Sequence, residues 1–492
     1  MNQLEHDVVV VGAGPNGLAA AVTLARAGLT VRVFEAQETV GGGARTVDSE
    51  MAAGIKHDVC SAVHPLALAS PFFTEFDLPA RGVELRSPRV SYAHPITADR
   101  AAIAYRSLAD TVEHLGTDGG AWRRLFGPLT RNFPDLVDLA LGPMRPDSAT
   151  LNTALKNPVG VQFALRVARQ SVANIRQSFA TDSGAALFAG VTAHASTSLP
   201  ALIPSGIGLM LGAAAHVEGW PIPVNGSQAI TQALVDDLAA HGGDIVTGRP
   251  IASENDLPPA RAYLFDTSPQ HFTELFAHRL PENVVRMSYR QGRGSGIAKV
   301  DFVLNGPIPW KVPEIGDAAT AHLGGTAQEV YAAEKAIMTG QHADHPVVLT
   351  SDPTVGDRGR EVDGRRPLWT YAHVPQGSPR NMTEAVIRQI ERFAPEFRDV
   401  IEDSRHVPAS QLSLTNANYI GGNISGGDLT LRRMLLGNRR WDPYATGLSR
   451  MYICSAATPP GPGVHGMAGW NAAKTVLKQQ FQLPTPNLSP TS

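Results

Sequence analysis

The feature that most constrains this chain stands near its amino terminus, where a glycine-rich segment follows an apolar run at residues 6–11. The segment contains Gly12, Gly14 and Gly17 in the spacing Gly-x-Gly-x-x-Gly, and an alanine-rich stretch follows it. In a strand–turn–helix unit, the first glycine permits a tight turn, the second lets the backbone approach a pyrophosphate, and the third lets the helix pack closely on the strand. The amino end of the helix offers unpaired N–H groups and a positive dipole to phosphates. The pattern predicts a dinucleotide-binding βαβ unit.

A second apolar run, residues 30–34, ends at Glu35 and extends this unit. A carboxylate at this position accepts hydrogen bonds from the ribose hydroxyls of an adenosine. Shortly afterwards, three consecutive glycines at residues 41–43 precede Arg45. A Gly-Gly turn with an arginine behind it places backbone amides and a guanidinium near the same pyrophosphate. The alternative is that the glycines form an ordinary loop and that Arg45 lies on the surface.

A third segment lies near the carboxyl terminus. Residues 450–457 are predicted to form a strand, residues 458–469 a turn rich in proline and glycine, and residues 470–480 a helix. A turn with few side chains lets the backbone lie against a flat ring, and the helix behind it directs its positive end toward that ring. Taken alone, the same stretch is also compatible with an ordinary Pro/Gly loop.

Together these segments resemble those of the phytoene desaturase-like FAD-dependent oxidoreductases, within the flavoprotein amine oxidase and carotenoid desaturase superfamily. Residues 226–230, 241–246 and 421–427 also resemble parts of that family, so the resemblance extends over almost the whole chain. It implies that the tightly bound cofactor is FAD and not NAD, because ordinary NAD dehydrogenases lack the Gly-Gly turn with its arginine. It also implies that the carboxyl-terminal helix stabilises negative charge on the N1/C2 edge of a reduced flavin.

The same resemblance assigns the cofactor contacts. They are Gly12, Gly14, Pro15, Asn16 and Gly17 in the first segment, Glu35, Ala36, Gly42, Gly43, Ala44 and Arg45 in the second, and Val246, Ala457, Pro462, Gly463, Val464, His465 and Met467 further on.

The resemblance implies an α/β fold with two lobes. A Rossmann-type FAD-binding lobe is assembled from discontinuous segments, and a mixed α+β lobe binds the substrate. We assign residues 1–86, 218–270 and 412–482 to the FAD-binding lobe, and residues 87–217 and 271–411 to the substrate lobe. The last residues, 483–492, are rich in Pro, Ser and Thr, and we expect them to be disordered.

Composition narrows the classes of protein. A chain of 492 residues is too long for one small core, and 43% hydrophobic with 18% charged residues is typical of globular proteins. The net charge of −3 and the lack of a basic arm argue against a nucleic-acid partner. Cys60 and Cys454 form no CxxC pair, so we expect neither a dithiol centre nor a metal site. With no signal peptide and no long apolar run, we expect a cytoplasmic protein without a membrane span.

Two further segments leave alternatives open. In residues 158–180, an apolar stripe runs beside basic residues, namely Val161, Leu165, Ala168, Val172, Ile175 and Phe179 beside Lys156, Arg166, Arg169 and Arg176. Such a helix either contacts an anionic membrane surface peripherally or packs on the protein with a solvated basic face. Residues 199–217, apolar but interrupted by Pro and Gly, form either a flexible wall of an apolar tunnel or a buried connection.

No Ser/His/Asp set or paired carboxylate stands out, but a flavin supplies the redox chemistry itself. We name His64, His465 and Tyr419 as candidate catalytic residues and expect them to be the few polar contacts of an apolar cavity over the ring. His194 is a further candidate proton acceptor. Each of these residues can instead be structural, and we expect Cys454 to be a buried thiol.

The predicted function is FAD-dependent dehydrogenation of a carbon–carbon bond in an apolar, isoprenoid- or lipid-like substrate, by hydride transfer to flavin N5. Amine oxidation, saturation or isomerisation of a polyene, and a non-catalytic flavin-bound scaffold remain alternatives. Oxygen or a quinone would accept the electrons.

Overall fold

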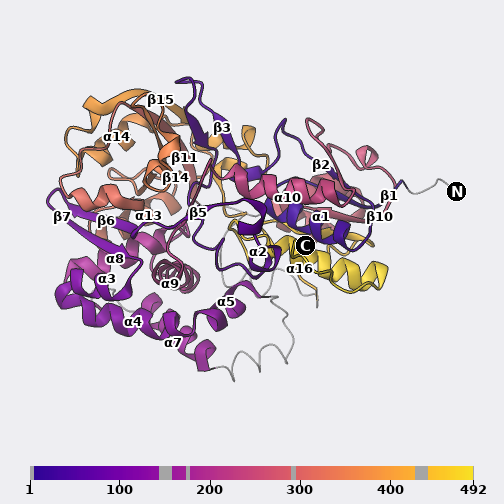
Figure 1. The fold of residues 1–492 in the computed structure, drawn as a ribbon, viewed down its shortest axis with the longest axis horizontal. Coiled ribbons are helices and arrows are strands. Elements are labelled where there is room, and N and C mark those ends of the chain that lie inside the picture. Colours follow the sequence, from indigo (N-terminus) through magenta and orange to yellow (C-terminus); the bar gives the residue numbers. More distant parts are fainter. Residues whose placement is uncertain (1–4, 143–157, 173–177, 290–294, 427–441, 491–492) are drawn as a thin grey trace.

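The computed structural model describes residues 5–142, 158–172, 178–289, 295–426 and 442–490. They form two lobes that lie side by side (Figure 1). One lobe contains both ends of the described chain and a parallel sheet, and the other contains a larger mixed sheet. The predicted α/β fold class is confirmed.

The parallel sheet has five strands in the order β16–β10–β1–β2–β9. Their bounds are Met451–Ile453, Ala260–Phe265, His6–Val11, Val31–Phe34 and Asp244–Val246. Each strand pairs with its neighbours in parallel, although the strands come from three distant stretches of the chain. Val8 and Val10 point to one side of the sheet and Val9 and Val11 to the other, and all four are buried, as expected for a parallel sheet covered on both faces.

Three helices lie over one face of this sheet: α1 (Pro15–Arg26), α10 (Gln228–Ala240) and α16 (Met467–Val476). On the other face lies α11 (Pro269–Phe276), whose Phe272 and Phe276 contact Phe265. Every residue of α1 from Asn16 to Ala25 is buried. The small alanine side chains explain this, because they let α10 and α16 approach α1 closely from both sides.

The mixed sheet has seven strands in the order β15–β11–β14–β13–β12–β6–β7. Their bounds are Ile401–Val407, Ser295–Leu304, Arg366–Pro375, Val348–Ser351, Ala318–Leu323, Val90–Thr97 and Arg100–Tyr105. All neighbours are antiparallel except β12 and β6. One face packs on α14 (Thr383–Glu391), and α8 (Asp182–Ala193) and α13 (Ala327–Met338) lie on the other.

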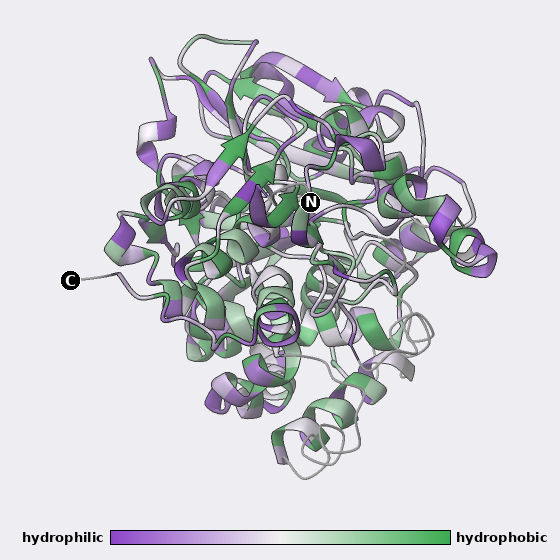
Figure 2. Cartoon of the chain, turned by 90° about the vertical axis from the view of Figure 1, so that its right-hand side faces the viewer, coloured by the Kyte–Doolittle hydropathy of each residue, from purple (hydrophilic) through white to green (hydrophobic). Residues whose placement is uncertain are grey.

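Further helices complete this lobe, with α3 at Leu108–His114, α4 at Gly119–Arg131, α5 at Phe133–Leu141, α7 at Pro158–Val172 and α9 at Leu202–Val217. The remaining elements include α2 (Pro71–Phe76), α12 (Glu282–Tyr289), β3 (Thr46–Asp48), β4 (Lys56–Asp58), β5 (Leu85–Arg86) and β8 (Ile222–Pro223). Green, apolar ribbon is concentrated in the strands and inner helices of Figure 2, while purple segments lie mainly at the periphery. Among the described helices, none is long and apolar enough to cross a membrane.

Residues 199–217, for which a flexible wall and a buried connection were both open, contain the regular, largely buried helix α9. Pro204 stands in the first turn of α9, where a missing N–H costs nothing. Gly208 and Gly212 face other helices: a Cβ atom at Gly208 would collide with Thr192 of α8, and one at Gly212 would lie 2.5 Å from the ring of Phe126 in α4. The glycines thus serve close helix packing and not flexibility.

The predicted disordered tail also differs from expectation up to residue 490. Leu488 is fully buried. The backbone around it accepts hydrogen bonds from two arginines: Arg26 donates to Asn487 and Ser489, and Arg81 donates to Leu488. The content of Pro, Ser and Thr suggested disorder. Composition does not show that two arginines from distant parts of the chain bind the backbone of the tail.

Candidate functional site

The glycine turn between β1 and α1 has the geometry that its spacing predicts. Gly12 adopts a φ of +100°, which favours glycine, and its N–H donates to the carbonyl of Phe34 on β2. A Cβ atom at Gly17 would collide with the carbonyl oxygen of Gly12. The turn is therefore compact enough to expose the amino end of α1.

The three predicted cofactor segments come together at this turn. The N–H of Gly41 donates to the carbonyl of Ala13 over 2.8 Å, and a Cβ atom at Gly42 would lie 3.0 Å from the Cα of Gly14. On the other side of α1, a Cβ atom at Gly469 in α16 would collide with the carbonyl of Asn16. Segments from opposite ends of the chain thus touch through glycine backbone.

Glu35 and Arg45 are both buried in this region. The two carboxylate oxygens of Glu35 accept from the N–H groups of Ala13 and Gln37, over 2.8 and 2.9 Å. The Arg45 guanidinium donates to the carbonyls of Gly42 and Thr415, so it is not a surface residue. Burial lowers the pKa of Arg45.

The other predicted contacts lie on the same side of the lobe. Val246 accepts a backbone hydrogen bond from Glu35, next to Ala36. Gly463 has a φ of +147° in the turn before α16, and Ala457 packs against Gly426. Of the rest, Pro15 and Met467 begin α1 and α16, Gly43 and Ala44 lie in the helical turn Gly42–Ala44, and Pro462 and Val464 lie in the turn before α16.

Asp266 was not singled out as a site residue, although the sequence shows an acid at the end of the predicted strand. Its Oδ2 atom accepts from the N–H of Gly17 over 2.9 Å, and a Cβ atom at Gly14 would lie 2.5 Å from the same oxygen. Burial raises the pKa of Asp266 to about 8, and the nearby Glu35 adds to this. A carboxyl group that is neutral at pH 7 is compatible with a phosphate at the helix terminus.

His64 lies in a network of buried polar groups between the lobes. Its Nε2 is 2.8 Å from the hydroxyl of Ser227, its Nδ1 is 3.4 Å from that of Ser61, and only 2% of the residue is exposed. Burial lowers the pKa of His64 to about 4. A ring with partners on both nitrogens and so low a pKa is a poor proton acceptor at neutral pH, so its geometry favours the structural alternative.

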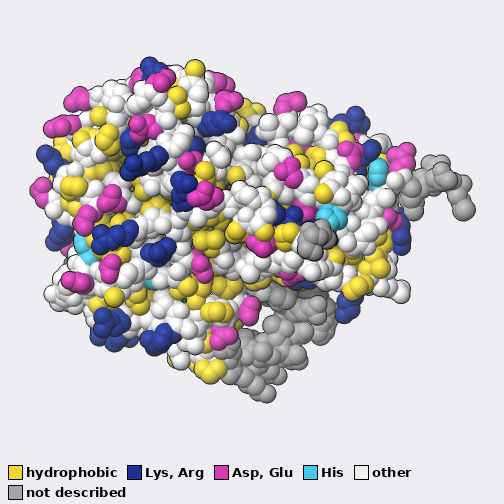
Figure 3. Space-filling model, in the orientation of Figure 1, with side chains coloured by type: hydrophobic (Ala, Val, Ile, Leu, Met, Phe, Trp, Pro, Cys, Tyr) yellow, Lys and Arg dark blue, Asp and Glu magenta, His cyan; other side chains and the backbone are white. Residues whose placement is uncertain are grey.

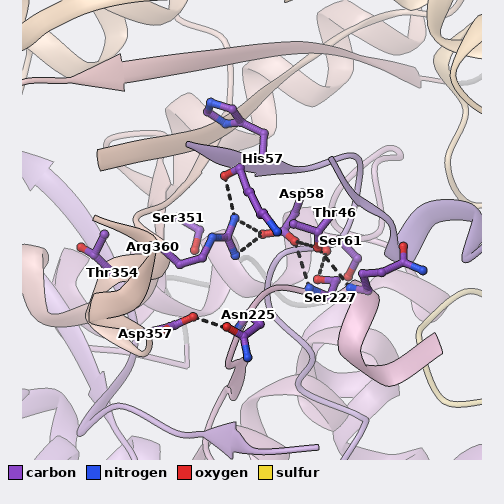
Figure 4. Close-up of polar contacts among 12 residues, drawn as sticks. Thr46, His57, Asp58, Ser61, Asn225, Ser227, Ser351, Thr354, Asp357 and Arg360 are labelled. Atoms are coloured by element: carbon purple, nitrogen blue, oxygen red, sulfur yellow. Dashed lines mark hydrogen bonds and ion pairs between the residues drawn. The ribbon is translucent and has the colours of Figure 1, made fainter. Parts of the chain in front are cut away.

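The centre of this network is Asp58, which sequence reasoning did not identify (Figure 4). Its Oδ2 accepts two hydrogen bonds of 3.2 Å from Arg360, and its Oδ1 accepts from Thr46 and from the N–H of Ser227. Burial alone would raise the pKa of Asp58, but Arg360 and these hydrogen bonds lower it. Since Arg360 precedes β14 and Asp58 ends β4, this ion pair joins the two lobes.

His465 and Tyr419 lie against the predicted flavin segments. The Nδ1 of His465 accepts from the N–H of Met467 at the start of α16, and burial lowers its pKa to about 4. A Cβ atom at Gly43 would collide with the hydroxyl of Tyr419. Burial and the neighbouring Cys60 raise the pKa of this hydroxyl well above its usual range. His465 therefore caps a helix, while Tyr419 covers the Gly-Gly segment.

Lys299 of β11 is a further charged residue that sequence reasoning missed. Its ammonium group is almost fully buried, contacts the carboxylate of Asp301 and lies 5.5 Å from the centre of the Trp369 ring. Burial raises the pKa of Cys60, while Tyr419 and Lys299 oppose that shift, which places the ammonium near the Gly-Gly segment. The available signal was a lysine and an aspartate two residues apart in a mainly apolar strand.

The pocket between the lobes differs from the predicted apolar cavity. Small neutral residues line it, namely Ala195, Ser196, Thr197, Ser295, Gly296, Ile297, Gly422, Asn423, Ile424 and Ser425. None of His64, His465 and Tyr419 is among them. His194 faces inward instead, with its Nε2 2.7 Å from that of His322, and burial lowers its pKa to about 3. Within the described ranges, no set of three or more His, Cys, Asp or Glu side chains is arranged to hold a metal.

The parallel Rossmann-like sheet and the mixed sheet together form a fold that matches the fold of the flavin amine oxidases. Residues 10–74 match the family described as an NAD(P)-binding Rossmann-like domain. The chain is similar to wild-type putrescine oxidase bound to putrescine, with a TM-score of 0.57 and 16% identity over 96% of this chain and 99% of the other.

Two similar proteins extend over nearly the whole chain. One is an uncharacterized protein of Mycobacterium tuberculosis, 25% identical over 96% of this chain and 97% of its own length. The other is the pyridine nucleotide-disulfide oxidoreductase domain-containing protein 2 of Rattus norvegicus, 24% identical over 96% of this chain and 94% of its own.

Proposed function

We propose that the protein is an FAD-dependent oxidoreductase that dehydrogenates a carbon–carbon bond of a neutral, largely apolar substrate. The observation that carries this proposal is the convergence of three glycine segments on the amino end of α1. NAD would need only the first segment, whereas FAD also uses the Gly-Gly segment and the turn before α16. Bound FAD would supply the two-electron redox chemistry.

Unpaired polar groups in the same region support a bound cofactor. The Oδ1 of Asn16, the Oγ1 of Thr267 and the amide group of Asn471 are buried and have no hydrogen-bond partner within the described residues. Buried polar groups normally find partners, so these atoms fit a ligand with many acceptors and donors. Glu35 would bind the ribose, the N–H groups of α1 the pyrophosphate, and Arg45 would stay buried beside them.

The pocket lining favours a neutral substrate over an amine. No charged side chain lines the pocket, and α8 and α9 beside it are almost entirely apolar. The carboxylates of Asp301 and Glu334 contact Lys299 and His373, and neither residue lines the pocket. Amine oxidation remains the second candidate because the fold is shared with putrescine oxidase. The same pocket would also serve saturation or isomerisation of a polyene, with oxygen or a quinone accepting electrons in the dehydrogenation.

We also infer a peripheral membrane contact through α7. Leu165 is 66% and Val161 39% exposed on this helix, whereas Val159 and Gln170 are buried. Arg169 is exposed close to them, but Arg166 donates to the carbonyls of Leu125 and Gln162 and is only partly free. Lys156, Ile175 and Arg176 lie outside the described residues.

No nucleic-acid partner is proposed, since Figure 3 shows acidic and basic side chains intermingled over the visible face.

The test is to measure cofactor content and reduction. Purified protein is expected to show flavin absorbance at about 370 and 450 nm. Gly14→Val is expected to abolish it, because the new side chain meets Asp266 and blocks the pyrophosphate. Gly120→Ala on α4, where a Cβ has room, is the control. Anaerobic bleaching by neutral isoprenoid substrates but not by amines would support the substrate class. Colourless protein that binds NAD tightly would contradict the proposal.

A further inference from the structure

A hydrogen-bonded chain of three side chains opens into the pocket between the lobes. The hydroxyl of Ser196, directly after α8, lies 3.3 Å from the Nε2 of His373 on β14. The Nδ1 of the same ring lies 2.5 Å from the Oε1 of Glu334 on α13. A hydroxyl, an imidazole and a carboxylate are thus connected in the order found in proton-transfer triads.

The surroundings of His373 and Glu334 determine which ring nitrogen of the histidine carries the proton. The side chains of His373 and Glu334 are both fully buried, and the imidazole ring stacks on Tyr371 with its centre 5.7 Å away. A carboxylate against Nδ1 holds the ring proton on that nitrogen, so that Nε2 is left as an acceptor toward Ser196. The second oxygen of Glu334 has no partner among the described residues.

The backbone at Ser196 is strained. Its φ of +45° lies in the left-handed region, at the end of a helix where glycine is usual. The strained conformation is held by hydrogen bonds: its N–H donates to Ala193, and its carbonyl accepts from the hydroxyl of Ser295. Strained non-glycine residues of this kind cluster at functional sites. Compared with glycine, a serine at this position makes the fold less stable but provides a hydroxyl group.

The pocket connects this hydroxyl with the predicted flavin segments. Ser196 lines the pocket together with Gly296 of β11 and Asn423. The loop that carries Asn423 continues to Gly426, whose added Cβ would lie 3.0 Å from the nitrogen of Ala457. A molecule in the pocket would therefore lie between Ser196 and the turn that faces the ring.

We propose that Ser196, His373 and Glu334 form an acid–base relay that accepts a proton from a neutral substrate in this pocket; the proposal rests on the proposed function. One substrate C–H bond breaks, and its electron pair becomes the second bond of a C=C. Ser196 Oγ receives that proton and passes its own proton to Nε2 of His373. The adjacent carbon gives up a hydride to the oxidant, FAD, so that two electrons and two hydrogens leave the substrate. Glu334 is a positioning residue, which orients the ring and stabilises its charged form.

The experiment uses the holoprotein and diisopropyl fluorophosphate, a small probe that phosphorylates base-activated hydroxyls. The relay predicts one adduct per chain, mapped to Ser196 by peptide mass spectrometry. His373→Gln and Glu334→Gln are expected to slow its formation by about a hundredfold or more. Ser198→Ala, at an exposed serine two residues away, is the matched control and leaves the rate unchanged. No adduct at Ser196, or a rate independent of His373, would overturn the relay.

Two measurements separate the relay from a structural role and from the cofactor proposal. Nitrogen-15 spectra of the histidines should show the His373 proton on Nδ1, and a proton on Nε2 instead would contradict the relay. Ser196→Gly should raise the melting temperature, because glycine tolerates the positive φ, yet abolish labelling; a lower melting temperature would indicate that the hydroxyl only stabilises the fold. FAD content should be unchanged in all of these variants. If the wild type reacts at Ser196 but carries no FAD, the relay stands and the proposed redox function fails.

Discussion

The two lobes build their parts of the site in opposite ways. In the lobe with the parallel sheet, the site consists of backbone: Gly14, Gly42 and Gly469 bring three segments together because they have no side chains. In the lobe with the mixed sheet, the site consists of buried side-chain pairs such as Lys299–Asp301 and His373–Glu334. The first arrangement suits a cofactor that is the same in many enzymes. We propose that the second determines what the individual protein does with the cofactor.

The largest effect is expected where the backbone contact is tightest. Gly469→Ala places a Cβ atom onto the carbonyl of Asn16, and neither helix can move away without opening the site. We expect the protein to lose FAD completely, as measured by absorbance after gel filtration. Gly120→Ala has room for its Cβ and should retain the cofactor. Full FAD occupancy of the Gly469 variant would mean that the packing of α16 on α1 does not form the site.

The difference between backbone contacts in one lobe and side-chain pairs in the other explains which site residues could be predicted from the sequence. Gly12, Gly14, Gly17 and Glu35 were identified because a local spacing determines their positions, and the same holds for the Gly-Gly segment. Tyr371 and Lys299 are partners only because β14 pairs with β11 in one particular register. No local pattern contains that register, so the sequence did not predict it.

Contacts between residues far apart in the sequence follow the same rule. His64 lies beside Ser227, which is remote in the sequence. Arg360 and Asp58 form a buried pair across even more of the chain. Asp266 was visible as an acid after a strand, yet its contact with Gly17 depends on how β10 pairs with β1.

The second prediction concerns the ion pair that joins the lobes. Both partners are nearly inaccessible, so removing one leaves an uncompensated buried charge. Arg360→Met or Asp58→Asn should each cost about 3–5 kcal/mol, seen as a lower melting temperature in circular dichroism. The double variant should lose less than the sum of the two single losses. Additive losses would indicate that the two residues do not interact.

The third prediction is a pH dependence in the backbone-built site. The folded pKa of Asp266, about 8, lies above that of an unfolded aspartate, so the carboxyl is neutral below about pH 8 and ionises above it. An ionised carboxylate repels a pyrophosphate. The titratable groups around it are Glu35, Cys454 and Tyr419; burial raises the pKa of the thiol and of the phenol, and Glu35 favours the neutral form of Asp266. FAD affinity should therefore be highest below pH 8 and fall by up to about tenfold per pH unit above it.

Titration of the apoprotein with FAD between pH 6.5 and 9.5, followed by flavin fluorescence, measures this dependence. Asp266→Asn keeps the size of the side chain but cannot ionise, so its affinity should stay constant across the range. A wild-type affinity as flat as that of the variant would show that Asp266 does not titrate there. The pH dependence would then have to arise from other groups.

The smallest effect is expected on the outer surface of the substrate lobe, where neither kind of site is involved. Leu165 and Val161 present exposed apolar area beside Arg169, and a basic residue near an anionic membrane contributes about 1 kcal/mol. Arg169→Gln should weaken binding to phosphatidylserine vesicles about fivefold at low salt, and Leu165→Ser should weaken it further. High salt should remove the arginine effect, because charges are screened beyond the Debye length, while the leucine effect persists. Arg398→Gln, on an exposed arginine next to α14, is the control in a flotation assay. If all variants float like the wild type, α7 is an ordinary surface helix and the substrate reaches the pocket from solution.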